Sequence, residues 1–177
     1  MKNTKVINLF GGPGAGKSTL SAGLFYQMKL MGLNVEQSSE WIKDKLFEDT
    51  PYPFKDQLYT FAKQNKRIRE KVGKVDYIIC DSPLIQGLVY QLQEPESFKT
   101  VMLDYFNLYD NVNLFLERIH RYQQSGRIQS EEQATKISHK IEQTLIQYNI
   151  PYTKLNSDTS INRIIEVLDF IKERKDN

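Results

Sequence analysis

The sequence predicts an α/β fold in which a parallel sheet is covered by helices on both faces. Two observations support this prediction: short apolar segments alternate with longer segments of helical periodicity, and the first apolar segment leads directly into a glycine-rich loop. Helices that connect successive strands make the sheet parallel and its crossovers right-handed. The carboxyl ends of the strands then meet at one edge, which is where ligands bind in such sheets.

Apolar periodicity assigns the elements in order along the chain. Residues 6–10 form an apolar strand that ends at glycines, and residues 18–31 form a helix that ends at Gly32. The apolar face of this helix consists of Leu20, Leu24, Met28 and Met31. Further strands are expected at residues 34–38, 75–80, 112–116 and 151–155, and further helices at residues 41–47, 54–68, 97–108, 130–148 and 161–171.

Two of these helices carry more detailed expectations. The helix at 130–148 opens with a capping box formed by Ser130 and Gln133. The inward residues of the helix at 97–108 are expected to be Phe98, Val101, Met102 and Tyr105.

Length and composition indicate one ordinary globular domain, spanning residues 1–177. Hydrophobic residues make up 40% of the chain and charged residues 26%, and the formal charge of +2 does not indicate a nucleic-acid binder. The single cysteine, Cys80, excludes an intramolecular disulfide and suits a reducing compartment. No apolar run approaches the ~20 residues of a membrane span. We therefore expect a cytoplasmic protein of a bacterium or a phage-infected host cell, with no membrane partner; the sequence does not indicate an oligomeric state.

The glycine-rich loop matches the phosphate-binding pattern G-x-x-x-x-G-K-[ST] in full. Phosphates bind where several backbone N–H groups point at one spot, and glycines permit that tight wrap. Lys17 supplies a cation for the β- and γ-phosphates, Ser18 a hydroxyl ligand for Mg²⁺, and Thr19 a contact to the α-phosphate. The sequence therefore predicts that ATP and Mg²⁺ bind at Gly11, Gly12, Pro13, Gly14, Ala15, Gly16, Lys17, Ser18 and Thr19.

The residues after the strand at 75–80 bear on the class of P-loop protein. Asp81 occupies the position of a second Mg²⁺ ligand, acting directly or through water, although Asp-Ser-Pro also makes a good turn or helix cap. Ser82 follows where most ATP-driven machines place a glutamate that activates water. A guanine motif is missing too, because the Asn65-Lys66 pair is not followed by x-Asp. Together these features favour a kinase over a motor or a GTPase switch.

A kinase also needs a group near the acceptor hydroxyl, cations for the moving phosphoryl group and a lid that excludes water. Glu40, just past the second strand, is the candidate base or hydroxyl anchor, with a helix N-terminal charge as the alternative role. Arg118, Arg121 and Arg127 follow the fourth strand within a polar segment, which we predict to be a lid at about residues 118–130. Any one of these arginines taken alone could equally be a surface residue.

This set of features resembles the nucleoside and nucleotide kinase group over nearly the whole chain. The resemblance rests on the strand–P-loop–helix start, Glu40, Asp81-Ser82 and the arginine-rich segment. It implies a strand order of 2-3-1-4-5 with the P-loop strand central, and an acceptor bound between the second strand, the helices that follow it and the lid. Deoxynucleoside kinases carry Glu-Pro and Glu-Arg-Ser where this chain has Glu40-Trp41 and Asp81-Ser82, which argues against a free nucleoside as substrate.

Residues 11–19, 81–84 and 126–127 more closely resemble small bacteriophage P-loop kinases that are often labelled only as ATPases. Some relatives of that kind phosphorylate hydroxymethyluracil in phage DNA. The resemblance therefore implies a kinase acting on a hydroxyl of a nucleotide or of a modified base in DNA, with 5-hydroxymethyluracil as the most specific expectation. The alternatives are a nucleoside monophosphate or deoxynucleoside kinase and, in another class, a regulatory P-loop ATPase without a phosphoryl acceptor.

A basic segment leaves the size of the acceptor open. Two acids and seven basic residues lie between positions 55 and 74; the basic ones are Lys55, Lys63, Lys66, Arg67, Arg69, Lys71 and Lys74. They form either a solvated helix face or a patch for the phosphates of one nucleotide or of a DNA strand. The partner is thus a nucleotide or DNA, and the sequence does not decide between them.

Overall fold

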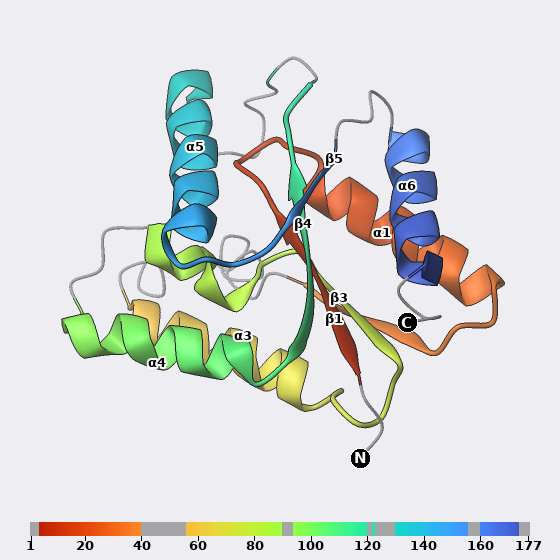
Figure 1. Cartoon of the computed structure of the whole chain (residues 1–177), viewed down its shortest axis with the longest axis horizontal. Helices are drawn as coiled ribbons and strands as arrows, with labels where there is room; N and C mark the ends of the chain where they lie inside the picture. Colours follow the sequence, from red (N-terminus) through yellow and green to blue (C-terminus); the bar gives the residue numbers. More distant parts are fainter. Residues whose placement is uncertain are drawn as a thin grey trace, which may run out of the picture.

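Five parallel strands form one sheet of order β2-β3-β1-β4-β5, as the resemblance implied (Figure 1). The computed structural model describes residues 4–39, 56–89, 94–119, 122, 130–155 and 160–173. The strands are β1 (Lys5–Phe10), β2 (Val35–Ser38), β3 (Tyr77–Cys80), β4 (Asp110–Leu116) and β5 (Thr153–Leu155). Because β1 pairs with β3 on one side and β4 on the other, the loops that leave these three strands meet at one edge of the sheet.

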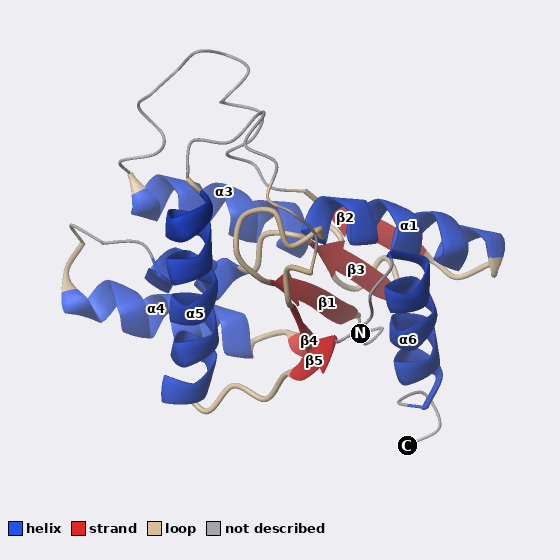
Figure 2. Cartoon of the chain, turned by 90° about the horizontal axis from the view of Figure 1, so that it is seen from above, coloured by secondary structure: helices blue, strands red, loops and turns tan. Residues whose placement is uncertain are grey.

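Helices cover both faces of the sheet, as predicted. They are α1 (Lys17–Leu30), α3 (Gln57–Arg69), the 3₁₀ helix η2 (Leu84–Val89), α4 (Glu96–Asn107), α5 (Glu131–Gln147) and α6 (Ser160–Glu173). Seen from above, α1 and α6 lie on one side of the sheet, and α3, α4 and α5 lie on the other (Figure 2). The expected helix at residues 41–47 lies outside the described residues.

Each face of the sheet has its own apolar core. Alternation along β1 sends Ile7 and Leu9 toward α1 and α6, and Val6 and Phe10 toward the other helices. All four side chains are at most 1% exposed, because helices cover both faces. Burial on both sides explains why β1 reads as a continuous apolar run rather than as an alternating one.

Two side-chain assignments of the predicted helices were wrong, and one short helix was missed. Met31 and Val101 are 45% and 40% exposed, so neither belongs to the apolar face to which the periodicity assigned it. Met31 follows the last turn of α1 as its C-cap, and the buried stripe of α4 has a strict four-residue spacing that excludes Val101; it consists of Phe98, Met102 and Phe106. The sequence also gave no sign of η2, whose single turns are too short to show helical periodicity.

The described part of the chain contains no helix that is both long and apolar enough to cross a membrane.

The capping box at the start of α5 is confirmed. The Gln133 backbone N–H donates to Ser130 Oγ over 3.3 Å, and the Ser130 backbone N–H donates to Gln133 Oε1 over 2.8 Å. These two bonds fix the residue at which α5 begins, because they satisfy N–H groups that have no partner inside the helix.

Replacing this cap tests how much the start of α5 contributes to stability. We expect Ser130→Ala to lower the free energy of unfolding by about 1 kcal/mol, because an alanine side chain cannot accept the Gln133 bond. Urea unfolding followed by circular dichroism measures the change. Ser130→Asp restores an acceptor and should recover most of the loss; equal stability of all three proteins would contradict the role of the cap.

Candidate functional site

The loop between β1 and α1 has the backbone geometry of a phosphate cradle. Gly14 and Gly16 adopt φ values of +78° and +87°, in the left-handed region that side-chain-bearing residues rarely occupy. Gly16 is also the N-cap of α1, and no side chain caps this helix or places a negative charge in its first turn. The positive end of the α1 dipole therefore faces the loop without a protein anion in that turn, which suits a bound phosphate.

Lys17 lies folded back over this loop. Its Nζ donates to the carbonyl oxygens of Gly11 and Gly12 over 2.7 Å and 3.1 Å. The ammonium charge is thus already held beside the first glycines of the cradle.

Ser18 and Asp81 meet across the site, as the two predicted Mg²⁺ ligands should. Ser18 Oγ donates to Asp81 Oδ2 over 3.2 Å, and Asp81 is only 6% exposed. The pairing of β1 with β3 produces this contact, since Asn8 lies opposite Cys80 and both chains then turn out of the sheet. A hydroxyl and a buried carboxylate in contact are a suitable donor set for a hard cation.

A cation at this position would need other ligands as well. Within the described ranges, no group of three or more His, Cys, Asp or Glu side chains is arranged to hold a metal ion. Mg²⁺ commonly binds through one or two protein groups, with phosphate oxygens and water completing its shell, so Ser18 and Asp81 fit this ion. Burial raises the pKa of the neighbouring Cys80 thiol to about 12, so the thiol adds no negative charge next to Asp81 at neutral pH.

Arg118 lies against the same loop. An added Cβ on Gly14 would stand 3.6 Å from Arg118 Cδ and 3.1 Å from the Tyr122 ring, so both residues contact the cradle. The guanidinium stacks over Tyr122 at 5.0 Å, and its Nη2 donates to Thr135 Oγ1 over 2.9 Å. Its Nη1 is buried and has no hydrogen-bond partner within the described residues. The arginine is therefore oriented by its neighbours while one donor group remains to be satisfied.

A cavity of about 310 Å³ opens beside the first half of the loop. Its walls come from the loop, the end of β4 and one face of α5; they include Gly12, Pro13, Glu117, Arg118, Thr135 and Ser138. The cavity brings the cradle, the Arg118 guanidinium and polar side chains of α5 together around one space.

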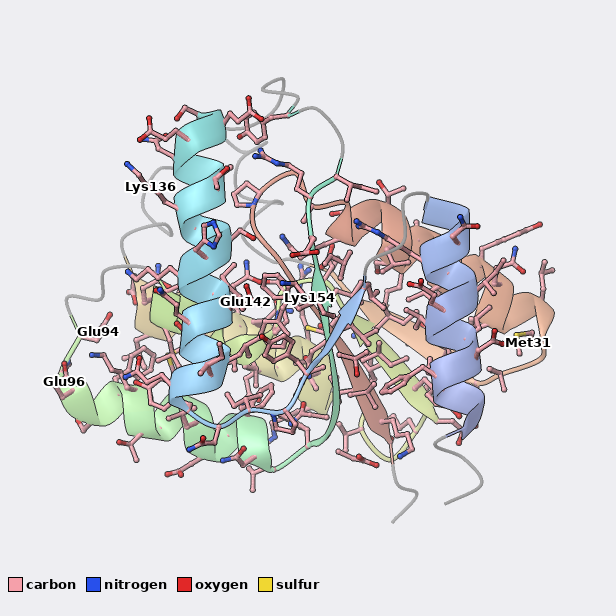
Figure 3. The ribbon with its side chains drawn as sticks, turned by 45° about the horizontal axis from the view of Figure 1, so that its top comes forward. Met31, Glu94, Glu96, Lys136, Glu142 and Lys154 are labelled. Carbon is pink, nitrogen blue, oxygen red and sulfur yellow. The ribbon has the colours of Figure 1, made fainter. Side chains whose placement is uncertain are left out.

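Ion pairs fix the residue that precedes Arg118. Lys154 on β5 contacts Glu117 over 2.7 Å and Glu142 over 3.2 Å, and Figure 3 shows Glu142 and Lys154 beside each other. The hydrogen bond to Glu117 is the largest cause that raises the pKa of Lys154, and the hydrogen bond to Glu142 is the next. Tyr152 also donates to Glu142 over 2.9 Å. The end of β4 is thus tied to α5 and β5 just before the chain reaches Arg118.

Three predicted site residues lie outside the described residues: Glu40, Arg121 and Arg127. The same holds for residues 120, 121 and 123–129 of the expected lid. Their roles remain predictions.

The sequence analysis missed Arg163, as it missed Tyr122 and Thr135. Arg163 on α6 is 4% exposed, and it donates through Nη1 to the Ala15 carbonyl over 3.0 Å and through Nη2 to the Glu117 carbonyl. A signal did exist: Arg163 stands at four-residue spacing with the buried Val167 and Ile171, so a charge occupies the apolar stripe of the helix.

The basic side chains on and after α3 are largely engaged with close neighbours. Lys66 pairs with Glu70 over 3.3 Å, and Arg67 donates to the Ser39 backbone carbonyl over 3.0 Å. Lys63 lies over the Tyr59 ring at 5.1 Å. These contacts suit a solvated helix face, and the patch for phosphates stays a prediction; Lys55 is outside the described residues.

The fold and the site define a P-loop protein, and the comparisons with known proteins agree. The chain belongs to a family described as AAA domain, whose model matches residues 6–163. No match was found among curated proteins.

Solved nucleoside and nucleotide kinase structures have the same fold. A deoxyadenosine kinase from M. mycoides with dCMP and dCDP bound has a TM-score of 0.62 and 20% identity, covering 95% of this chain and 99% of the other. The same enzyme with dATP gives a TM-score of 0.59 and 22% identity over 94% and 99%. A thymidylate kinase from Ehrlichia chaffeensis gives 0.67 and 15% over 96% and 99%. At these identities the likeness establishes a shared fold.

The close approach of α5 to the loop yields a steric test at Gly12. An added Cβ there would lie 2.7 Å from the Ala134 carbonyl oxygen and 2.8 Å from Ser138 Cβ. We expect Gly12→Ala to lower the free energy of unfolding by roughly 1–3 kcal/mol, because α5 must move away, and to weaken ATP binding. Urea unfolding and calorimetric titration with ATP measure the two effects.

Lys136→Ala is the matched control, because Lys136 lies on α5 and points away from the loop (Figure 3). It should leave both quantities nearly unchanged. If Gly12→Ala had the same free energy of unfolding and the same affinity for ATP as the control, α5 would not be in contact with the cradle.

Proposed function

We propose that this chain is a kinase that uses ATP and Mg²⁺ to phosphorylate a hydroxyl of a nucleotide or of a modified base in DNA. One observation carries the proposal: Lys17, the Ser18–Asp81 pair and Arg118 reach the cradle from three different segments. Phosphoryl transfer depends mainly on such convergent charge and positioning. The kinase fold of the solved relatives supports this choice of reaction.

For the donor side of the reaction we propose roles for four of the described residues. The loop amides and Lys17 hold the β- and γ-phosphates and stabilise the charge on the moving phosphoryl group. Ser18 and Asp81 would hold Mg²⁺, which when bound neutralises phosphate charge. Arg118, whose Nη1 still lacks a described partner, supplies a further donor to the phosphoryl oxygens.

The transfer itself exchanges one bond for another. The bond between the γ-phosphorus and the bridging oxygen breaks and leaves ADP, and a new bond forms between that phosphorus and the acceptor oxygen. The acceptor hydroxyl loses its proton in this step. We propose that Glu40 either accepts that proton as the base or anchors the hydroxyl. Arg121 and Arg127 complete the proposed clamp when the lid closes.

For the acceptor, our specific proposal is 5-hydroxymethyluracil in phage DNA. It rests on the resemblance of residues 11–19 and 81–84 to bacteriophage kinases. A nucleoside monophosphate or a deoxynucleoside is the alternative, supported by the kinases that share the fold. The local contacts of Lys66 and Arg67 give no preference for a DNA strand. A panel of acceptors is therefore needed to decide between DNA and a small nucleotide or nucleoside.

A regulatory ATPase is the candidate from another class, and the family description as an AAA domain favours it. The absence of a glutamate after Asp81 argues against it, since Ser82 cannot activate water as a general base. The two candidates differ in where the γ-phosphate ends up.

Labelled ATP tests the reaction directly. We expect the label to appear on one member of a panel of mononucleotides, nucleosides, plain DNA and DNA containing 5-hydroxymethyluracil. Lys17→Ala should slow this transfer by at least about a hundredfold, because it removes a cation from the transition state. Label found only in free phosphate would favour the ATPase, and full transfer by Lys17→Ala would refute the central role of the cradle.

Asp81→Asn separates metal binding from nucleotide binding. We expect kcat to fall about a hundredfold with little change in the Kd for ATP, since an amide holds Mg²⁺ less well than a carboxylate but does not disturb the cradle. Added Mn²⁺ should restore part of the activity. Asp110→Asn, at the opposite edge of the sheet, is the control. Unchanged turnover in Asp81→Asn would assign Asp81 a structural role only.

A further inference from the structure

We infer that Arg163 is a positioning residue that sets the direction of one cradle amide and of the Arg118 backbone at the same time. The link to Arg118 rests on the function proposed above, whereas the link to the cradle rests on geometry alone. The two donor bonds of Arg163, to the Ala15 and Glu117 carbonyl oxygens, are the observations that carry it.

The bond to Ala15 fixes a peptide plane within the loop. The Ala15 carbonyl and the Gly16 N–H belong to one peptide unit, and in a trans peptide these two groups point in opposite directions. The structure contains no cis peptide among its described residues. Arg163 holds the Ala15 carbonyl on the side of α6, so the Gly16 N–H points to the opposite side, away from α6.

Such a restraint matters because Gly16 is the most permissive residue type at a demanding position. It adopts a φ of +87°, and because a glycine has no Cβ, many other backbone conformations are also open to it. If the N–H donor is already fixed, the loop does not have to reorganise when negative charge develops on the transferred phosphoryl group. This is the basis of electrostatic preorganisation. Arg163 thereby acts on the phosphate without touching it.

The second bond fixes the exit from β4. The Glu117 carbonyl shares its peptide unit with the Arg118 N–H, so Arg163 sets the path along which Arg118 leaves the sheet. The Glu117 carboxylate is held separately by Lys154. Backbone and side chain of the residue before Arg118 are thus both restrained, and Arg118 leaves the sheet from a fixed point, with its Cδ beside Gly14.

Docking of α6 delivers Arg163 to this position. Gly23 of α1 leaves room for Ile164, since an added Cβ there would overlap its side chain. The close approach brings the start of α6 beside the start of α1, where Arg163 Nη1 lies 3.8 Å from the place of a Cβ on Gly16.

The chemistry of the side chain suits a geometric role. A planar guanidinium presents several donors in fixed directions and can hold two carbonyls from separate segments, whereas a lysine ammonium is a single point on a flexible stem. Burial lowers the pKa of Arg163, while Glu166 and Glu117 act in the opposite direction. An arginine still stays charged at neutral pH, so both donor bonds persist. If only apolar packing were required, Val167 and Ile171 show which residue types serve on this stripe.

Three variants distinguish positioning from charge and from packing. Arg163→Met keeps the length and removes the donors, Arg163→Lys keeps the charge without the fork, and Ile165→Ala alters an exposed residue of the same helix as a control. Backbone amide shifts of Gly16 and Arg118 are read by NMR without nucleotide. We expect both to move in Arg163→Met and Arg163→Lys, and neither in the control.

Affinity and turnover then test the consequence. We expect Arg163→Met to raise the Kd for ATP about tenfold and to lower kcat, and Arg163→Lys to recover only a minor part of either loss. Combining Arg163→Met with Arg118→Met should cost less in kcat than the product of the single effects, because both act through Arg118. Thermal melts establish that each protein is folded at the assay temperature.

Several outcomes would overturn the inference. Unmoved Gly16 and Arg118 amides, full function in Arg163→Lys, or a lowered melting temperature with unchanged ATP affinity and kcat would each leave Arg163 a structural or purely electrostatic residue. If Arg163→Met does not fold, Arg163→Lys and its amide shifts decide. A wild-type protein that binds ATP but phosphorylates no acceptor would refute the proposed function, while the amide shifts and ATP affinities would still test Arg163.

Discussion

Parallel pairing of β1 with β3 on one side and β4 on the other is the constraint on which the site depends. The register places Asn8 opposite Cys80 and Phe10 opposite Phe115, so the carboxyl ends of β3 and β4 each lie within about two residues of the carboxyl end of β1 along the sheet. The cradle, Asp81 and the segment leading to Arg118 therefore leave the sheet side by side. A slip of one residue would turn the buried side chains of β1 to the wrong faces, and this penalty keeps the register fixed.

Helices on both faces complete the cradle that the strands begin. On one face α5 approaches so closely that only glycine fits at position 12, and it orients Arg118 through Thr135. On the other face α6 reaches over α1 and holds Ala15 through Arg163. The loop is restrained from both sides before any phosphate binds, so less of the binding free energy goes into ordering it.

Charge at the site is distributed to suit an anionic ligand. Lys17, Arg118 and Arg163 lie in or against the loop, and Asp81 is the buried carboxylate that faces Ser18. A carboxylate in this position would repel phosphate, and a bound divalent cation would offset that repulsion. The proposed Mg²⁺ site and the proposed reaction with ATP therefore depend on each other.

The sequence by itself determined the features that arise from neighbouring residues. The glycine pattern of residues 11–19, the capping box at Ser130 and the apolar runs of the strands are local signals. The structure confirms the α/β sheet, the helices that fall within its described residues and that capping box. Strand order was available only through resemblance, because local periodicity does not say which strands are neighbours. Only the tertiary structure decided that Tyr122 lies against the cradle and that Arg163 reaches Ala15, 148 positions earlier in the chain. Such contacts depend on how α6 docks against α1, and no short stretch of sequence encodes the meeting of two helices that far apart.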